Sequence, residues 1–319
     1  MTEGGGLRIA VYGDGQWAAD TLGRLAGAGH RIAGVILRAS PSDSTLGDAA
    51  ARLRVPILRP ANVNAPDAVA EIAALRSELG ISVAYNQILR APVRDAHPRG
   101  VVNFHAGMLP LYRGRNVINW AIINGETEIG LTAHYVDDGI DTGDIITQLA
   151  LPIGWTDDYG DVLRRVVDRM PSLVVDTVRD IAAGTAQRRR QADHPGTYFG
   201  GRGEGDEWID WSASSRAIHN FIRAISVPGP GARTTVRNEP VIIWRAFYDP
   251  SWPNYVATPG QVVGRHSSGA LVKTGDSTIR VEVIEGPSGR RPPAWPIGTR
   301  LGWTWRMGTH APPVARAPR

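Results

Sequence analysis

Short apolar runs alternate with amphipathic stretches along the first part of the chain. The amphipathic stretches place apolar residues three and four positions apart, which predicts helices, and the short runs predict strands. This alternation is typical of a mostly parallel sheet that is covered by helices on both faces. The predicted strands are 7–12, 32–37, 55–58, 81–85, 101–104, 130–136 and 144–149, and the predicted helices are 16–28, 43–53, 66–75, 116–123 and 158–183.

The pattern changes after residue 183. Gly, Arg and Pro are frequent in 184–206, which predicts a linker, and 214–225 predicts one more helix. The later apolar segments are short and alternate with polar residues, as in strands that are buried on one face. We expect an α/β protein with a doubly wound N-terminal sheet and a smaller, β-rich, OB-like C-terminal domain. The expected limits are 1–190 for the N-terminal domain, 191–227 for a linker and helix, and 228–319 for the C-terminal domain with its Pro/Arg-rich tail.

Composition excludes several classes of protein. The 319 residues contain no cysteine, so the chain has no thiol nucleophile, disulfide or thiolate metal site. Hydrophobic residues make up 42% and charged residues 21%, as in a globular protein. No apolar run approaches the roughly 18 residues that span a membrane, and the N-terminus lacks the basic start of a signal peptide. We therefore expect a cytoplasmic protein without a membrane partner.

The charge of the chain is unevenly distributed. The formal net charge is +4, but six arginines and no acidic residue lie in 287–319. The rest of the chain holds 29 basic and 31 acidic side chains and is slightly acidic. A general nucleic-acid binder would carry a basic face on its body, so this distribution makes nucleic acid an unlikely partner.

The turn after the first strand contains Gly13, Asp14 and Gly15 and superficially resembles a dinucleotide-binding loop. That fingerprint also needs an acidic residue after the second strand, where this chain has Arg38, Ala39 and Ser40. A nicotinamide cofactor is therefore not expected. An ordinary strand-to-helix turn accounts for the glycines, although a loop at this edge of the sheet is also placed to contact a substrate.

Polar side chains gather at the end of the strand 101–104 and in a glycine-rich acidic turn. Asn103 and His105 are two positions apart and leave the strand on the same face, and the turn 137–144 can bring a carboxylate to the histidine. A histidine paired with a carboxylate can act as a general base or as a donor to an oxyanion, and an amide supplies a second donor. No nucleophilic residue follows His105, which indicates direct attack by the substrate. A structural, hydrogen-bonding histidine is the alternative.

These residues belong to a longer series of motifs. Asn103-Phe-His105 is followed by Leu109-Pro110-x-Tyr112-Arg113-Gly114 and by Asp141-Thr142-Gly143-Asp144. In this order the motifs resemble the 10-formyltetrahydrofolate-dependent formyltransferases. Further similar segments extend the resemblance over roughly residues 7–265: Asn119-Trp120, Asn124-Gly125-Glu126, Gly130-Leu-Thr132-x-His134, Tyr198-Phe199, Trp208–Trp211, 218–224, 228–232 and 259–262.

The resemblance implies a Rossmann-like catalytic domain, a catalytic triad and a folate co-substrate. By this likeness the catalytic residues are Asn103, His105 and Asp141, no metal takes part, and N10-formyltetrahydrofolate is the formyl donor. Many family members have serine where this chain has Gly107, so a hydroxyl at that position is in doubt. A surface salt bridge is the alternative interpretation of Arg113. The residues implied in the folate site are Asn86, Gln87, Ile88, Leu89, Arg113, Gly114, Val136, Asp137 and Asp138.

The acceptor amine is the open question. Methionyl-tRNA formyltransferases carry a basic loop after the second strand, where this chain has one arginine and two acidic residues between 38 and 48. We therefore favour a nucleotide-linked amino sugar, with Gly13, Asp14, Gly15 and Arg202 as candidate contacts to its diphosphate. Methionyl-tRNA and the hydroxyornithine of siderophore assembly stay open as alternatives. The expected partner is this small-molecule substrate, and a second copy of the chain stays open.

Overall fold

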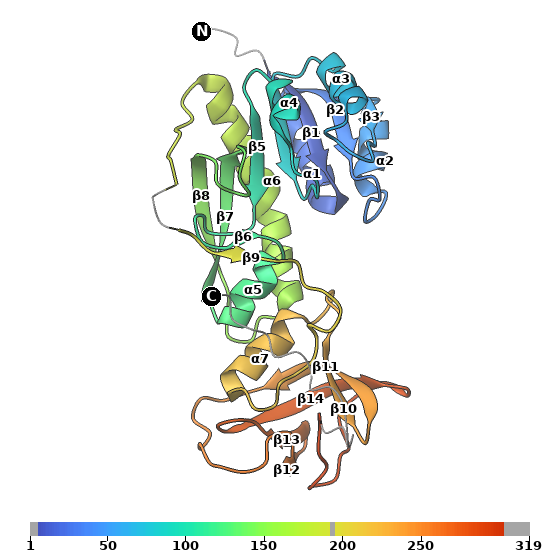
Figure 1. Cartoon of the computed structure of the whole chain (residues 1–319), viewed down its shortest axis with the longest axis vertical. Helices are drawn as coiled ribbons and strands as arrows, with labels where there is room; N and C mark the ends of the chain where they lie inside the picture. The colour runs from blue at the N-terminus through green and yellow to red at the C-terminus, as the bar shows by residue number, and fades with distance from the viewer. Residues whose placement is uncertain (1–5, 192–194, 303–319) are drawn as a thin grey trace. The chain divides into compact units, whose positions relative to one another are not determined.

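The structure is a computed structural model that describes residues 6–191 and 195–302. The chain divides into two compact units, one ending at Arg202 and the other beginning at Gly203 (Figure 1). This division falls inside the segment 191–227 that the sequence predicts as a linker and helix. The last part of the predicted Pro/Arg-rich tail, 303–319, lies outside the described residues.

A seven-stranded sheet forms the centre of the first unit, with the strand order β3-β2-β1-β4-β5-β7-β8. Neighbouring strands from β3 to β5 are parallel, whereas β7 is antiparallel to both β5 and β8. The predicted mostly parallel sheet is therefore confirmed. The strands are β1 (Arg8–Gly13), β2 (Arg31–Leu37), β3 (Ile57–Leu58), β4 (Leu79–Val83), β5 (Val101–His105), β7 (Glu128–Tyr135) and β8 (Ile145–Pro152).

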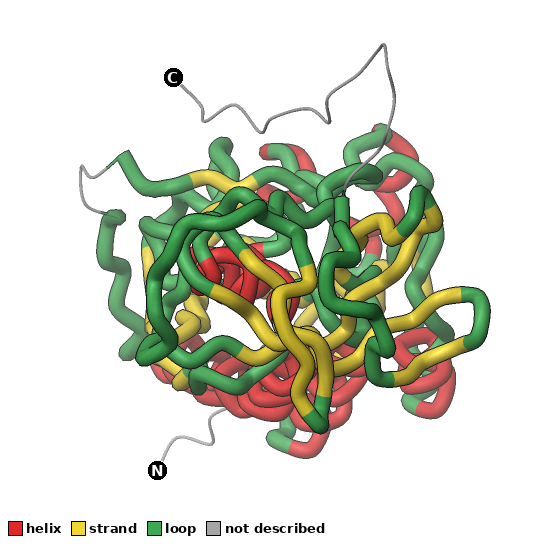
Figure 2. The backbone as a smooth tube through the Cα atoms, turned by 90° about the horizontal axis from the view of Figure 1, so that it is seen from below, coloured by secondary structure: helices red, strands yellow, loops and turns green. Residues whose placement is uncertain are grey.

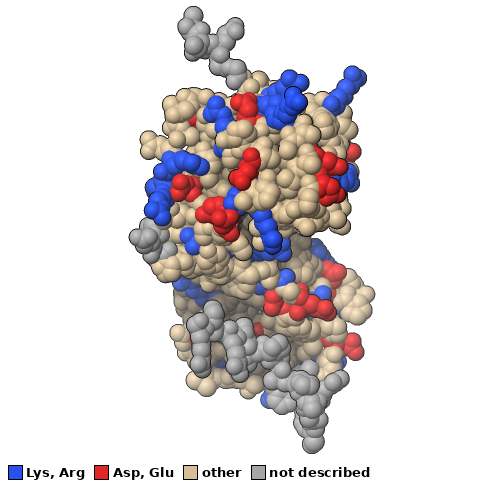
Figure 3. Space-filling model, turned by 45° about the horizontal axis from the view of Figure 1, so that its top comes forward, with Lys and Arg blue, Asp and Glu red and all other residues tan. Residues whose placement is uncertain are grey.

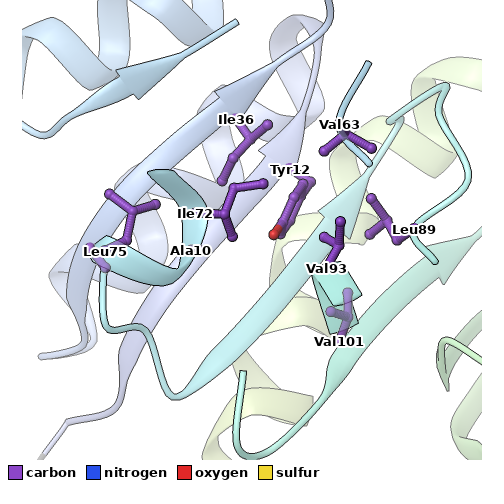
Figure 4. Close-up of a cluster of buried hydrophobic side chains, with 10 residues drawn as sticks. Ala10, Tyr12, Ile36, Val63, Ile72, Leu75, Leu89, Val93 and Val101 are labelled. Atoms are coloured by element: carbon purple, nitrogen blue, oxygen red, sulfur yellow. The ribbon is translucent and has the colours of Figure 1, made fainter. Parts of the chain in front are cut away.

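Helices cover this sheet because successive side chains of its buried strands point to opposite faces. On one face, Ala10 and Tyr12 of β1 pack in a buried cluster with Ile72 of α3 and Val93 of α4 (Figure 4). Away from this cluster, α6 packs against α1, α5 and β7. The helices of the first unit are α1 (Gly15–Gly27), α2 (Thr45–Arg52), α3 (Pro66–Ala74), α4 (Ala91–Asp95), α5 (Val117–Asn124) and α6 (Tyr159–Ala183).

Strands and loops dominate the second unit (Figure 2). A six-stranded antiparallel sheet has the order β10-β11-β14-β13-β12, and β15 pairs with β14. The helix α7 (Ser215–Ala224) packs on β11 and β14, and Ser214 caps its N-terminus by accepting from Ala217 N. The β-rich C-terminal domain is confirmed. Its strands are β10 (Ala232–Val236), β11 (Glu239–Phe247), β12 (Val262–His266), β13 (Gly269–Lys273), β14 (Thr278–Gly286) and β15 (Gly289–Arg291).

Several short elements were not predicted, among them α4, β15 and a two-stranded sheet. The two-residue strands β6 (Arg113–Gly114) and β9 (Tyr198–Phe199) pair in parallel and tie the segment after β5 to the end of the first unit. Among the described residues, no helix is both long enough and apolar enough to cross a membrane.

Candidate active site

The predicted catalytic residues converge at the carboxyl end of β5. Asn103 and His105 lie on β5, where the strand meets β4 on one side and β7 on the other. Asp141 lies in the turn of residues 137–144 that joins β7 to β8, which we call the Asp141 turn. The antiparallel pairing of β5 with β7 is what brings this turn back to the strand that carries the histidine.

The three side chains are within interaction distance. Asp141 Oδ2 lies 3.7 Å from His105 Nδ1, and Asp141 Oδ1 lies 3.5 Å from Asn103 Nδ2. The carboxylate also accepts a 2.9 Å hydrogen bond from the backbone N–H of Gly114. The His105 side chain is 8% exposed and the Asp141 side chain 12%. The structure thus brings the predicted triad together in a largely dehydrated site.

A second histidine belongs to this group and was not among the predicted site residues. His134 of β7 stands directly opposite Asn103 in the antiparallel register. Its Nε2 lies 3.2 Å from Asn103 Nδ2 and 3.5 Å from Asp141 Oδ1, and its side chain is 2% exposed. Its Nδ1 donates to the carbonyl of Tyr135, and its Nε2 faces both the amide of Asn103 and the carboxylate of Asp141. Its place opposite Asn103 follows from the strand register, which the sequence did not supply.

Both predicted oxyanion donors are hydrogen-bonded inside the protein. His105 Nε2 lies 2.6 Å from the carbonyl oxygen of Tyr112, and because a carbonyl only accepts, Nε2 carries the proton. Nδ1 of the neutral ring then presents its lone pair toward Asp141. The amide nitrogen of Asn103 faces His134 and Asp141. A substrate oxygen that takes these donors has to replace acceptors that the protein itself provides.

The electrostatics of the site favour a neutral imidazole beside an ionised carboxylate. Burial lowers the pKa of His105, which the negative charge of Asp141 only partly offsets. Burial alone would raise the pKa of Asp141, but the positive charge of His105 in its protonated form, the hydrogen bond with His134 and the N–H of Gly114 outweigh it and lower this pKa to about 2. At neutral pH the site therefore holds a fixed negative charge next to a ring that can take up a proton.

Several contacts hold the Asp141 turn in place. Asp141 has φ 55°, in the left-handed region that residues with a Cβ rarely adopt. Gln191 donates from Nε2 to the carbonyls of Asp141 and Gly143, at 2.7 and 2.9 Å, and accepts from Arg113. Arg113 is 7% exposed and also donates to the Tyr198 hydroxyl, so its interpretation as a surface salt bridge is wrong. Gln191 is a further residue that the sequence did not single out.

The residues implied in folate binding lie in two adjacent loops, except Arg113 and Gly114, which form β6. Arg94 donates to the carbonyl of Leu89 at 3.1 Å and to that of Asp137 at 3.0 Å, which joins the loop after β4 to the start of the Asp141 turn. Val136 packs against the buried cluster that contains Leu89. The two loops therefore form one wall beside the triad, in which the carbonyls of Leu89 and Asp137 both accept from Arg94.

Side chains in this wall contribute unequally. Gln87 is turned away, because its amide bonds to Val63 N and Pro60 O. Ile88 is 58% exposed. The carbonyl of Asn86 accepts from Arg115, and the exposed carboxylate of Asp138 pairs with Arg94. Among residues 6–191 and 195–302, no group of His, Asp and Glu side chains is arranged to hold a metal ion.

The candidate diphosphate residues occupy two separate places. Asp14 is 3% exposed, and its oxygens accept from Ser42 N and pair with Arg38 at 3.0 Å. A carboxylate engaged in this way holds the loop and offers no donor to a diphosphate. Gly15 has φ 68°, which explains the second glycine of the turn. Arg202 lies with its guanidinium over the ring of Trp120, on the β9 side of the site.

The structure explains why residue 107 is a glycine. A Cβ at this position would lie 2.5 Å from the carbonyl oxygen of Tyr112 and 2.6 Å from His105 Nε2. Those are the two atoms of the short hydrogen bond described above. The glycine therefore permits this contact.

Comparisons with known proteins show the family of the chain. The sequence profile of the formyl transferase family matches residues 8–178, and the profile of the formyl transferase C-terminal domain matches 203–296. Methionyl-tRNA formyltransferases from Solibacter usitatus and Roseiflexus castenholzii are 31% and 33% identical, each over 95% of this chain and 99% of the relative. The N-formyltransferase from Helicobacter canadensis, solved with folinic acid and dTDP-3-aminofucose, is 20% identical with a TM-score of 0.70, covering 86% of this chain and 99% of that one.

Proposed function

The chain belongs to the formyltransferase family, and from this premise we propose that it moves a formyl group from N10-formyltetrahydrofolate to the primary amine of a nucleotide-linked amino sugar. The observation that carries the transfer chemistry is the buried group of Asn103, His105 and Asp141 beside the wall of the two loops. The choice of acceptor rests on a separate observation, which is that the positive charge in the loop after β2 is neutralised within the protein.

The bound donor supplies an electrophilic formyl carbon, which the neutral acceptor amine attacks. The new C–N bond forms at that carbon, the bond from the carbon to N10 of the folate breaks, and one proton passes from the amine nitrogen to N10. His105 Nε2–H and the amide of Asn103 stabilise the oxygen that becomes negative. One such donor contributes on the order of 3 kcal/mol to the transition state.

Asp141 supports this step mainly through its charge. A carboxylate whose pKa is about 2 is a weak base at neutral pH. It instead orients His105 and stabilises the positive charge that this ring carries while it passes the proton from the amine nitrogen to N10 of the folate. This arrangement explains why the site needs no nucleophile of its own.

The loop after β2 supports a small acceptor. Its arginine, Arg38, pairs with Asp14 and donates to the carbonyl of Ala84, so its charge is neutralised within the protein. Asp43 and Asp48 add negative charge nearby. Figure 3 shows basic and acidic side chains interspersed over the face in view. An RNA that binds through its phosphates needs several free cations on one surface.

Methionyl-tRNA is the second candidate acceptor. The specific observation in its favour is that relatives with this name are about 30% identical over nearly the whole chain. The Helicobacter canadensis enzyme, whose structure holds an amino-sugar nucleotide, is 20% identical and supports the fold alone. The two candidates therefore have to be separated by experiment.

The deciding experiment offers the enzyme N10-formyltetrahydrofolate with one acceptor at a time. The panel holds 3-amino and 4-amino sugar nucleotides, hydroxyornithine and methionyl-tRNA, and mass spectrometry detects the gain of one formyl group. We expect product with an amino-sugar nucleotide and its loss in His105→Ala. Formylation of methionyl-tRNA alone, with salt-sensitive binding of initiator tRNA in a gel shift, would replace the proposed acceptor.

A further inference from the structure

Gln191 makes the most complete set of contacts of any residue around the site that has no assigned role. It lies 50 residues beyond Asp141 in the chain, and yet its amide nitrogen donates to the carbonyls of Asp141 and Gly143 at 2.7 and 2.9 Å. Its amide oxygen accepts from Arg113 Nε at 3.2 Å and from Arg113 Nη2 at 2.5 Å. Both hydrogens and both lone pairs of the amide are therefore used.

The orientation of this amide is fixed by chemistry. A guanidinium only donates, so the oxygen of Gln191 has to face Arg113. The NH2 group then has to face the Asp141 turn, whose two carbonyls only accept. Arg113 is itself 7% exposed and anchored by the Tyr198 hydroxyl and by the short β6–β9 pair. A rigid segment outside the turn thus holds the turn through one side chain.

The Asp141 turn depends on such support. Asp141 adopts φ 55°, which a residue with a Cβ occupies only when its surroundings impose it. Gly143 lies so close to the carbonyl of Tyr135 that a Cβ there would collide with it. The carboxylate of Asp141 lies 3.7 Å from His105 Nδ1 and 3.5 Å from His134 Nε2. A shift of the turn by one ångström would remove these contacts.

We propose that Gln191 is a positioning residue for formyl transfer, which holds the backbone of Asp141 and thereby the distance between its carboxylate and His105. This inference rests on the proposed function, in which His105 takes up the proton and Asp141 orients and stabilises it. Gln191 acts through Asp141 and does not touch the reacting atoms.

The test uses two substitutions that separate the two ends of the amide. Gln191→Met removes both ends. Gln191→Glu keeps an acceptor for Arg113 but replaces the NH2 group by an oxygen opposite two carbonyls. Both variants should lower kcat by about 10–100-fold, as expected for a misplaced catalytic group. The loss should be larger in kcat than in KM for the formyl donor, because Gln191 is not itself among the residues implied in the folate site.

A second readout needs no acceptor. NMR titration of His105 in the purified full-length chain should give a lower pKa in both variants than in the wild type, because the carboxylate that raises it has moved away. If the wild type formylates no acceptor of the panel, the proposed function fails, and the titration alone then decides the role of Gln191.

Gln148 provides the matched control. It too accepts from an arginine, Arg189, and donates to a backbone carbonyl, that of Leu109, but it does not bond the Asp141 turn. Gln148→Met should leave kcat and the titration of His105 within about twofold of the wild type, as a contact independent of the turn would. Circular dichroism verifies folding, and Gln191→Asn replaces Gln191→Met if the latter does not fold.

Three results would overturn the inference. The first is a kcat of Gln191→Glu equal to that of the wild type together with a lowered kcat of Gln191→Met, because Gln191 then holds only Arg113. The second is wild-type kcat and His105 pKa in both variants. The third is an equal loss in Gln148→Met, because the effect would then reflect general weakening of the sheet edge.

Discussion

Asp141→Asn tests the electrostatic part of the site most directly. The substitution keeps the size of the side chain and an oxygen that can accept from the N–H of Gly114, which is 2.9 Å from the carboxylate in the wild type. It removes the negative charge 3.7 Å from His105 Nδ1. The change therefore isolates charge from shape.

The magnitude follows from the distance. Two unit charges about 4 Å apart interact by about 4 kcal/mol at an effective dielectric constant of about 20. The Asp141 side chain is only 12% exposed, so solvent screens the pair weakly. If the imidazolium of His105 forms in the transition state, losing this interaction should lower kcat by about 10³-fold, since about 1.4 kcal/mol corresponds to a factor of ten.

Two measurements test this expectation. Steady-state kinetics with the acceptor identified in the panel should show the loss in kcat. NMR titration should show the pKa of His105 below its wild-type value, because the charge that raises it is gone. Asp20→Asn, on the exposed side of α1, is the control for charge removal elsewhere. A kcat within tenfold of the wild type, or an unchanged titration of His105, would refute the electrostatic role.

Three further predictions concern the stability of the fold, the activity and the accessibility of a lysine. His97 is buried and bonded to Tyr12, and burial lowers its pKa to about 4. The unfolded chain therefore takes up a proton below about pH 6.5 while the folded chain does not, so this group should cost up to about 3 kcal/mol of stability between pH 6.5 and 4. Urea unfolding at pH 7 and 4.5 should show that the free energy of unfolding depends less on pH in His97→Gln than in the wild type. An equal change in this free energy between the two pH values in both chains would contradict the argument. Gly143→Ala should lower kcat at least tenfold through the collision with the Tyr135 carbonyl, measured in the formylation assay; full activity would show that the turn can yield. Lys273, the one lysine of the sequence, is fully buried, so amine-reactive reagents should label it only after unfolding, and mass spectrometry would reveal any labelling of the native chain.

Much of the fold could be predicted because its elements carry local patterns. Each strand of the seven-stranded sheet overlaps an apolar run in the sequence. The pair β6–β9 could not be found in this way. Two-residue strands have no periodicity, and the partners Arg113 and Tyr198 are 85 positions apart. Such a pair exists because the tertiary fold brings the segments together.

In the candidate site, too, the residues with a local sequence signal could be predicted and the others could not. Asn103 and His105 share a strand face by their spacing, and the motif resemblance pointed to Asp141. His134 could not be placed, because its position opposite Asn103 depends on the antiparallel register of β5 and β7. Gln191 sits in an irregular segment without any local signal. The two residues that sequence reasoning missed are thus those whose place depends on strand register or on an irregular segment.

The two donors proposed to bind the substrate oxygen, His105 Nε2 and the amide of Asn103, already have acceptors within the protein. Under the proposed function this affects catalysis. Tyr112 O occupies His105 Nε2 at 2.6 Å, where a formyl oxygen would have to bind. Exchanging one neutral carbonyl for another changes the free energy of the ground state little, because one hydrogen bond replaces a similar one. The gain comes only when the new oxygen acquires negative charge, since hydrogen bonds to charged groups are roughly twice as strong. An enzyme that stabilises the transition state more than the bound substrate raises kcat, and the internal acceptor at Tyr112 is a means to that difference.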